Sequence, residues 1–114
     1  SAVHSFPTRR SSDLYAGDID RNTAAARKYS RFAVETGYIP IAPHLLFPQF
    51  MNDGDPTERE LALFFGNALM CKCSEVWVFG DTISNGMAAE IRRARWKNYR
   101  LRYFTEELEE QYDV

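Results

Sequence analysis

The stretch with the clearest chemical potential joins a predicted strand at 75–79 to a predicted helix at 87–97. It carries carboxylate, hydroxyl and amide side chains and a glycine, in the order Asp81, Thr82, Ser84, Asn85 and Gly86. The free N–H groups at a helix start, with such side chains beside them, can hold a phosphate or a sugar hydroxyl. Glu90 lies one turn further on, and its side chain leans back toward the start of the helix. A carboxylate beside a bound sugar can attack the anomeric carbon and form a covalent glycosyl ester.

Two interpretations of this stretch follow from its spacing. In the first, Ser84, Asn85 and Gly86 bind a sugar or phosphate and Glu90 is the nucleophile. In the second, Glu90 only complements the helix dipole or faces solvent, as glutamates in the first turns of helices commonly do. The chain contains neither a Walker-type glycine run with Lys-Ser/Thr nor a dinucleotide fingerprint, which disfavours phosphoryl and hydride transfer.

Alternating helix and strand patterns must position these residues. An amphipathic helix at 21–36 ends at Gly37, and a short strand at 38–42 contains Pro40, which suggests an edge position. A second helix at 56–72 follows the N-cap residue Asp55. Its predicted buried stripe consists of Leu61, Phe64, Phe65, Ala68 and Leu69. The remaining elements are the strand at 75–79, the helix at 87–97, a strand at 101–104 and a final acidic helix at 105–110. This order predicts an α/β domain of βαβ units with a doubly wound parallel sheet.

The segment 43–51 is too rich in proline for a regular element and too apolar for an ordinary solvated loop. We expect it to line a cleft or a contact between subunits. His44 and Gln49 are its polar members and could face a ligand, and the amide of Gln49 suits the edge of a nucleobase. Both could equally be hydrogen-bonded loop residues.

Composition narrows the class of protein. The chain has 114 residues and a formal net charge of −2, so we expect one small domain. Its Lys and Arg residues are scattered, which argues against a nucleic-acid partner, and no apolar run approaches the roughly 20 residues that span a membrane. Cys71 and Cys73 are too few for a zinc site and fit reduced thiols in the cytoplasm. No metal or cofactor is expected.

The first fourteen residues have the pattern of a sequence artefact. The run His4-Ser5-Phe6-Pro7-Thr8-Arg9-Arg10-Ser11-Ser12-Asp13-Leu14 is the translation of a common short-read sequencing adapter. We therefore expect 1–14 to be non-native and disordered, as a cloning scar would be. The native α/β domain would be 15–114, with its first, central strand missing or replaced.

Four segments together resemble the nucleoside 2-deoxyribosyltransferase-like superfamily, and within it an uncharacterised branch of bacterial and phage domains. They are Tyr15-Ala16-Gly17-Asp18, Tyr38-Ile39-Pro40-Ile41-Ala42-Pro43-His44, Phe47-Pro48-Gln49-Phe50 and Trp77-Val78-Phe79-Gly80. The resemblance covers 15–104 and implies a flavodoxin-like or Rossmann-like three-layer domain with a central parallel sheet. It also implies a nucleoside or nucleotide as the small-molecule substrate, contacted by Tyr15 and Gly17 in the loop after the first strand.

The resemblance carries over to the turn and its helix. Ser84, Gly86 and Glu90 match the spacing of the superfamily's enzymes, which implies sugar or 5′-phosphate contacts for the first two and nucleophilic attack for Glu90. Asn67 stands where the enzymes carry an aspartate that helps protonate the leaving base, and an amide cannot donate that proton at neutral pH. Asp81 could substitute.

The activity implied is N-glycosidic bond hydrolysis or deoxyribosyl transfer. The alternative is a non-catalytic module that binds a nucleotide or nucleotide-sugar. A homo-oligomer is also implied, because related enzymes complete each site with a neighbouring subunit.

Overall fold

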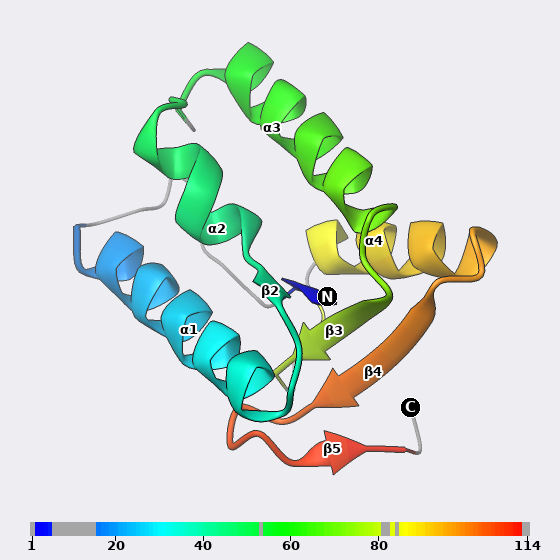
Figure 1. Cartoon of the computed structure of the whole chain (residues 1–114). Helices are drawn as coiled ribbons and strands as arrows, with labels where there is room; N and C mark the ends of the chain where they lie inside the picture. The colour runs from blue at the N-terminus through cyan, green and yellow to red at the C-terminus, as the bar shows by residue number, and fades with distance from the viewer. Residues whose placement is uncertain (1, 6–15, 53, 81–82, 84, 113–114) are drawn as a thin grey trace.

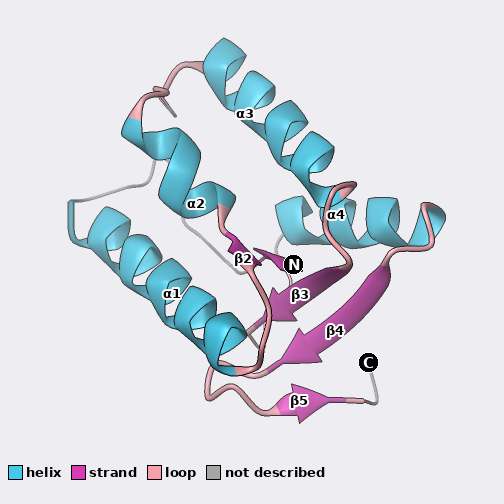
Figure 2. Ribbon diagram, in the orientation of Figure 1, coloured by secondary structure: helices cyan, strands magenta, loops and turns pink. Residues whose placement is uncertain are grey.

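The computed structural model describes residues 2–5, 16–52, 54–80, 83 and 85–112, which form an α/β domain (Figures 1 and 2). In chain order its elements are β1 (Ala2–Ser5), α1 (Ala16–Glu35), β2 (Pro40–Ile41), α2 (Pro43–Leu46), the 3-10 helix η2 (Phe47–Gln49), α3 (Pro56–Met70), β3 (Glu75–Phe79), α4 (Asn85–Trp96), β4 (Arg100–Phe104) and β5 (Glu110–Gln111).

One mixed sheet organises the domain. Its strand order is β2-β1-β3-β4-β5, and the first four strands run parallel. The strand β5 pairs antiparallel with β4, with Phe104 opposite Glu110. The prediction of an α/β domain with parallel βαβ units is confirmed, and the edge position predicted from Pro40 is correct.

The strand β1 lies inside the sheet, where it pairs with the edge strand β2 on one side and with β3 on the other. The sequence led us to expect the native first strand to be missing or replaced and 1–14 to be disordered. The expectation of disorder is wrong for residues 2–5, which form a strand with Val3 opposite both Ile41 and Val76. Two parallel neighbours offer unpaired backbone donors and acceptors at this place, and a short extended segment satisfies them.

The two faces of β3 build the core. Every residue of β3 is buried, and successive side chains point to opposite faces. Trp77 and Phe79 join Phe104 and the Ala26, Tyr29 and Ala33 stripe of α1 in one cluster. On the other face, Val76 and Val78 meet residues of α3 and α4: Met70, Met87, Ile91 and Ala94.

Helices end and begin largely where the sequence predicts. Gly37 follows α1 with φ 94°, and the Tyr38 N–H donates to the Ala33 carbonyl, the bond of a helix ending with a left-handed residue. The side chain of Asp55 accepts from the Thr57 N–H at 2.9 Å and caps α3.

Three predictions of local structure are wrong. Residues 16–18, expected in a loop, open α1, and the segment 43–51 contains the short helices α2 and η2 instead of being irregular. The predicted helix at 105–110 is instead a turn at 105–109 followed by β5, which begins at Glu110. Leu108 has φ 70° in this turn, and the Thr105 N–H donates to the Glu109 carbonyl.

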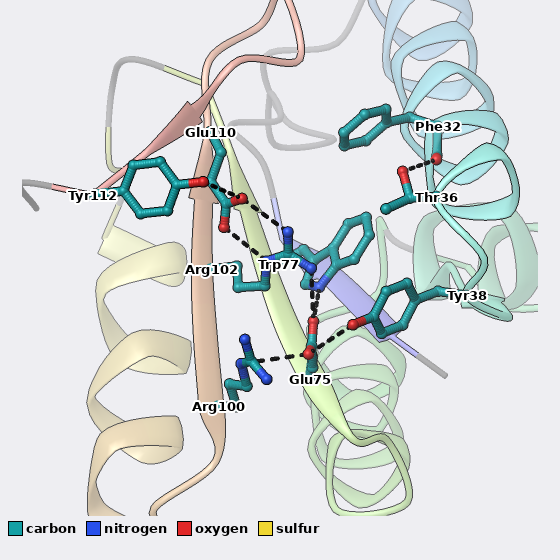
Figure 3. Close-up of polar contacts among 9 residues, drawn as sticks. All are labelled: Phe32, Thr36, Tyr38, Glu75, Trp77, Arg100, Arg102, Glu110 and Tyr112. Atoms are coloured by element: carbon teal, nitrogen blue, oxygen red, sulfur yellow. Dashed lines mark hydrogen bonds and ion pairs between the residues drawn. The ribbon is translucent and has the colours of Figure 1, made fainter.

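A buried carboxylate ties several of these elements together (Figure 3). Glu75 opens β3 and is 4% exposed. Its Oε1 accepts from Trp77 Nε1 at 2.7 Å and from Arg102 Nη1 at 3.3 Å, and its Oε2 accepts from the Tyr38 hydroxyl at 2.9 Å. Arg100 Nε lies 3.4 Å from the same carboxylate. The carboxylate thus links β3, β4 and the connection from α1 to β2.

Arg102 carries the network on to β5. Its Nε and Nη2 donate to the two oxygens of Glu110 at 2.7 and 2.8 Å, a bidentate pair. Its guanidinium also lies 5.0 Å from the ring centroid of Trp77 and 5.3 Å from that of Phe104. These contacts explain why 110–111 forms a strand: Glu110 reaches Arg102 from the strand paired beside it.

The network lowers the pKa of both carboxyls. For Glu75 burial acts to raise the pKa, but the hydrogen bonds from Trp77, Tyr38 and Arg102 outweigh it and the pKa falls below its ordinary value. For Glu110 the hydrogen bond from Arg102 is the largest effect and lowers the pKa. Both groups are therefore ionised in the folded chain at neutral pH.

Removing the central carboxylate should destabilise the fold. Glu75→Ala leaves the donors of Trp77, Tyr38 and Arg102 without their buried acceptor, and we expect the free energy of unfolding to fall by about 3 kcal/mol. Denaturant titration measures this. The control is Arg100→Gln, because the Arg100 side chain is 71% exposed and its ion pair should contribute less than about 1 kcal/mol. An equal loss of unfolding free energy in the two variants would contradict the role of Glu75 as the buried acceptor that holds the network together.

The lowered pKa values also set a pH dependence. The carboxyls of Glu75 and Glu110 have a pKa below the ordinary 4.5 in the folded chain, so the unfolded chain takes up protons first as the pH falls. The stabilisation is complete well above pH 4.5 and is lost as the pH drops through and below that value. We expect the free energy of unfolding to decrease from about pH 5 to about pH 3, and less steeply in Glu75→Gln. Equal slopes in the two proteins would be the contrary result.

Candidate active site

The candidate site lies at the carboxyl ends of the parallel strands, where β3 gives way to α4. Gly80 follows β3 directly, and its N–H donates to the carbonyl of Phe104 at 3.0 Å. Its φ of 104° lies in the region that favours glycine. Gly80 therefore stays attached to the neighbouring strand while it turns the chain out of the sheet toward α4.

The helix α4 begins at Asn85 and presents one apolar side to the sheet. Met87, Ile91 and Ala94 are buried, as predicted. Glu90 lies in the second turn and is half-buried, and it interacts with its surroundings. The predicted order of a strand followed by a helix that carries Glu90 is therefore present, and Figure 1 shows α4 after β3.

Asn67 and Glu90 lie on helix sides that border the same buried cluster. Met70 of α3 and Ala94 of α4 both belong to the cluster that contains Val76. Asn67 lies one turn before Met70, Glu90 lies one turn before Ala94, and residues three or four apart share a helix face. Both residues are half-buried.

Several other predicted site residues are either outside the described part of the chain or at the starts of α4 and α1. Tyr15, Asp81 and Ser84 lie outside the residues that the structure describes. Asn85 and Gly86 form the first turn of α4, as their predicted role requires. Gly17 lies in the first turn of α1 rather than in a loop.

His44 and Gln49 lie on the short helices that follow β2. His44 is half-buried in α2 and interacts with other groups. Gln49 is exposed, and its amide Nε2 donates to the Leu45 carbonyl within the same segment. This contact supports the interpretation of Gln49 as a residue hydrogen-bonded within its own segment, rather than as one that faces a ligand.

A cavity that the sequence did not predict lies beside α4, between residues of that helix, Ile83 and Tyr103 of β4. It has a volume of about 330 Å³ and is lined by Ile83, Ala88, Ile91, Arg92, Arg95 and Tyr103. Arg95 Nη2 donates to the Tyr103 hydroxyl at 3.1 Å. The spacing of Ala88, Arg92 and Arg95 at one helical turn was the only sequence signal for it. Its guanidinium groups suit an anion, but Glu90 is not among its lining residues.

The described residues show neither a metal-binding cluster nor a membrane-spanning helix. Among them, no group of three or more His, Cys, Asp or Glu side chains is arranged to hold a metal ion. In the same part of the chain, no helix combines the length and apolar character needed to cross a membrane.

The chain is thus an α/β domain that carries a glutamate, Glu90, on the helix α4 that follows the strand β3. Comparison with protein families places residues 12–104 in the family described as Domain of unknown function (DUF7768), and the chain belongs to that family. Comparison with curated proteins and with solved structures gives no match.

The turn at Gly80 gives a direct test of how the site is positioned. Gly80→Ala forces a side chain into a positive-φ conformation at the end of β3, and we expect a loss of about 1–2 kcal/mol in the free energy of unfolding. The matched control is Gly66→Ala inside α3, where an added Cβ would meet nothing within 4 Å. It should gain about 0.5–1 kcal/mol through helix propensity. Thermal and denaturant unfolding should show a lower stability for Gly80→Ala and a higher one for Gly66→Ala. A stability change of the same sign in both variants would contradict the role given to Gly80.

Proposed function

We propose that this chain binds a nucleoside or nucleotide at the carboxyl ends of β1 and β3 and cleaves its N-glycosidic bond through Glu90. In this proposal the domain is a small flavodoxin-like one, and the start of α4 holds the sugar or its 5′-phosphate. Water or a second base then accepts the sugar from the glycosyl ester on Glu90.

The observation that carries the proposal is the position of Glu90. It is half-buried on the second turn of the helix that directly follows the buried strand β3. A carboxylate at this place leans toward the first turn of α4, whose free N–H groups attract anionic and hydroxyl groups. A bound sugar would therefore present its anomeric carbon near the carboxylate.

A second candidate function rests on Asn67. This residue is half-buried one turn before Met70, and it is an amide where the resemblance calls for a proton-donating carboxyl. An amide can hydrogen-bond a base but cannot protonate it as it leaves. The second candidate is therefore a module that binds a nucleotide or nucleotide-sugar without turnover.

The test is a panel of deoxynucleosides and deoxynucleotides incubated with the full chain, with free base measured by chromatography. We expect base release that falls by a factor on the order of 10³ or more in Glu90→Gln, which removes the nucleophile and keeps the side-chain shape. The exposed Glu107 supplies a matched control, because Glu107→Gln makes the same chemical change and should leave the rate unchanged. Base release that survives in Glu90→Gln would overturn the mechanism.

Asn67→Asp separates the two functions. If the missing acid limits the reaction, this variant should release base faster than the parent chain by a factor of about 10²–10⁴. A ligand-dependent rise in melting temperature without base release in either protein would select the binding module. Neither base release nor a change in melting temperature with any member of the panel would overturn both functions.

A further inference from the structure

Two features of the surface lie outside the site proposed for Glu90. The first is the outward side of α3, where the predicted burial of Leu61, Phe64 and Ala68 is wrong, since all three are exposed. The described residues do not show what covers this apolar side. The second is the cavity beside α4, where guanidinium and hydroxyl groups stand next to apolar side chains. The cavity therefore indicates the chemistry of a ligand, whereas the side of α3 does not.

The floor of the cavity is apolar and firmly packed. Ile91 of α4 is 6% exposed and belongs to the same buried cluster as Val78 of β3, and Tyr103 of β4 packs against that cluster. Ile83 also lines the cavity and is 51% exposed, so part of its apolar surface remains uncovered. Such a floor favours a ligand with a ring or alkyl body over a bare ion.

Two guanidinium groups and one hydroxyl supply the polar side of the cavity. Arg92 and Arg95 are three residues apart and therefore share one side of α4. Arg95 Nη2 donates to the Tyr103 hydroxyl oxygen at 3.1 Å, which also holds the Arg95 side chain in place. Because this oxygen accepts a bond, its own O–H remains able to donate to a ligand. All three groups thus offer donors, and the ligand must supply acceptors.

The positive charge of the cavity is not balanced within the described residues. Among them, no carboxylate forms an ion pair with Arg92 or Arg95, and no acidic residue stands three or four positions from either one in the chain. Arg31 of α1, by contrast, pairs with Glu35 one helical turn away at 2.9 Å. Like charges on neighbouring turns of a helix repel one another. A bound anion would remove that repulsion.

A phosphate monoester matches this set of donors better than a carboxylate does. Near neutral pH it carries close to two negative charges and three free acceptor oxygens, which suits the two guanidinium groups and the Tyr103 hydroxyl. A carboxylate has one charge and two oxygens, which a single guanidinium already satisfies as a fork. The volume of about 330 Å³ lies near the lower end of the range for small-molecule sites, roughly 300–1,000 Å³. One ring beside the phosphate is therefore of suitable size.

We propose that the cavity beside α4 binds an organic phosphate monoester. The phosphate lies between Arg92, Arg95 and the Tyr103 hydroxyl, and the apolar body of the ligand covers the floor at Ile91. Glu90 does not line this cavity, because a separation of two residues places it on the opposite side of α4 from Arg92. The cavity is thus a separate site, and its ligand does not depend on the activity proposed for Glu90.

The experiment is isothermal titration calorimetry of the full chain with phenyl phosphate, a phosphate monoester on one apolar ring. The parent chain should bind phenyl phosphate about tenfold or more tightly than inorganic phosphate, which lacks the ring. Benzoate has the ring but a carboxylate in place of the phosphate, and it should bind more weakly by a similar factor. Equal affinity for phenyl phosphate and either comparison anion would overturn the proposal. So would a parent chain that does not bind phenyl phosphate at concentrations on the order of millimolar.

Matched variants locate the bound probe. Arg92→Gln and Arg95→Gln should each raise the dissociation constant for phenyl phosphate about tenfold or more, because each removes a charged donor. Tyr103→Phe keeps the ring, removes the hydroxyl and should raise the constant several-fold. The control is Arg93→Gln, which makes the same charge change at an exposed position of α4 outside the cavity and should leave the constant nearly unchanged.

Circular dichroism and thermal melting of each variant without the probe check that it is folded. An Arg93→Gln variant that loses as much affinity as Arg92→Gln would show a general effect of charge and would overturn the assigned site. Folded Arg95→Gln or Tyr103→Phe variants that bind phenyl phosphate as tightly as the parent chain would do the same.

Discussion

The carboxylate of Glu75 is the constraint on which the arrangement of this sheet depends. A glutamate buried at the start of β3 is unfavourable unless every oxygen is bonded and the charge is balanced. Trp77, Tyr38 and Arg102 meet that requirement only when β3, β4 and the connection from α1 to β2 hold one relative position. Arg102 then requires a second carboxylate, which β5 supplies. The network thus selects one register from the many that an apolar sheet would tolerate.

This constraint acts at the amino end of β3, whereas the proposed chemistry lies at its carboxyl end. Between them stand the buried rings of Trp77 and Phe79, packed on Phe104 and α1. Close packing of this kind transmits position along the strand. The direction in which Gly80 leaves the sheet, and so the start of α4, is therefore set by interactions on the opposite side of the domain.

Sequence patterns predicted the elements whose signals are local. The β-branched and aromatic run of β3, the Asp55 cap of α3 and the positive-φ Gly37 each appear where expected. The candidate site was predictable to the same extent, because Glu90 and the first turn of α4 are contiguous in the chain. Asn67 is distant from Glu90 in the chain, and only the resemblance linked the two.

The failures have a common physical origin in contacts between distant segments. The acidic run at 105–110 has helical propensity, but the bidentate bond between Glu110 and Arg102 favours a strand. The periodicity of α3 identified an apolar face without saying what would cover it. The sequence placed Glu75 in the predicted strand at 75–79 without assigning it a partner, and the structure shows the donors that converge on it.

The two edges of the sheet bear on how copies of this chain can meet. At one edge β2 has two residues, and Pro40 has no N–H to offer. At the other, β5 is equally short and covers part of β4. Both edge strands are two residues long and offer an incoming strand few backbone partners, which disfavours edge-to-edge stacking of the kind that begins fibrils. An apolar helix can then remain exposed in this domain without an open sheet edge beside it to extend the contact into an aggregate.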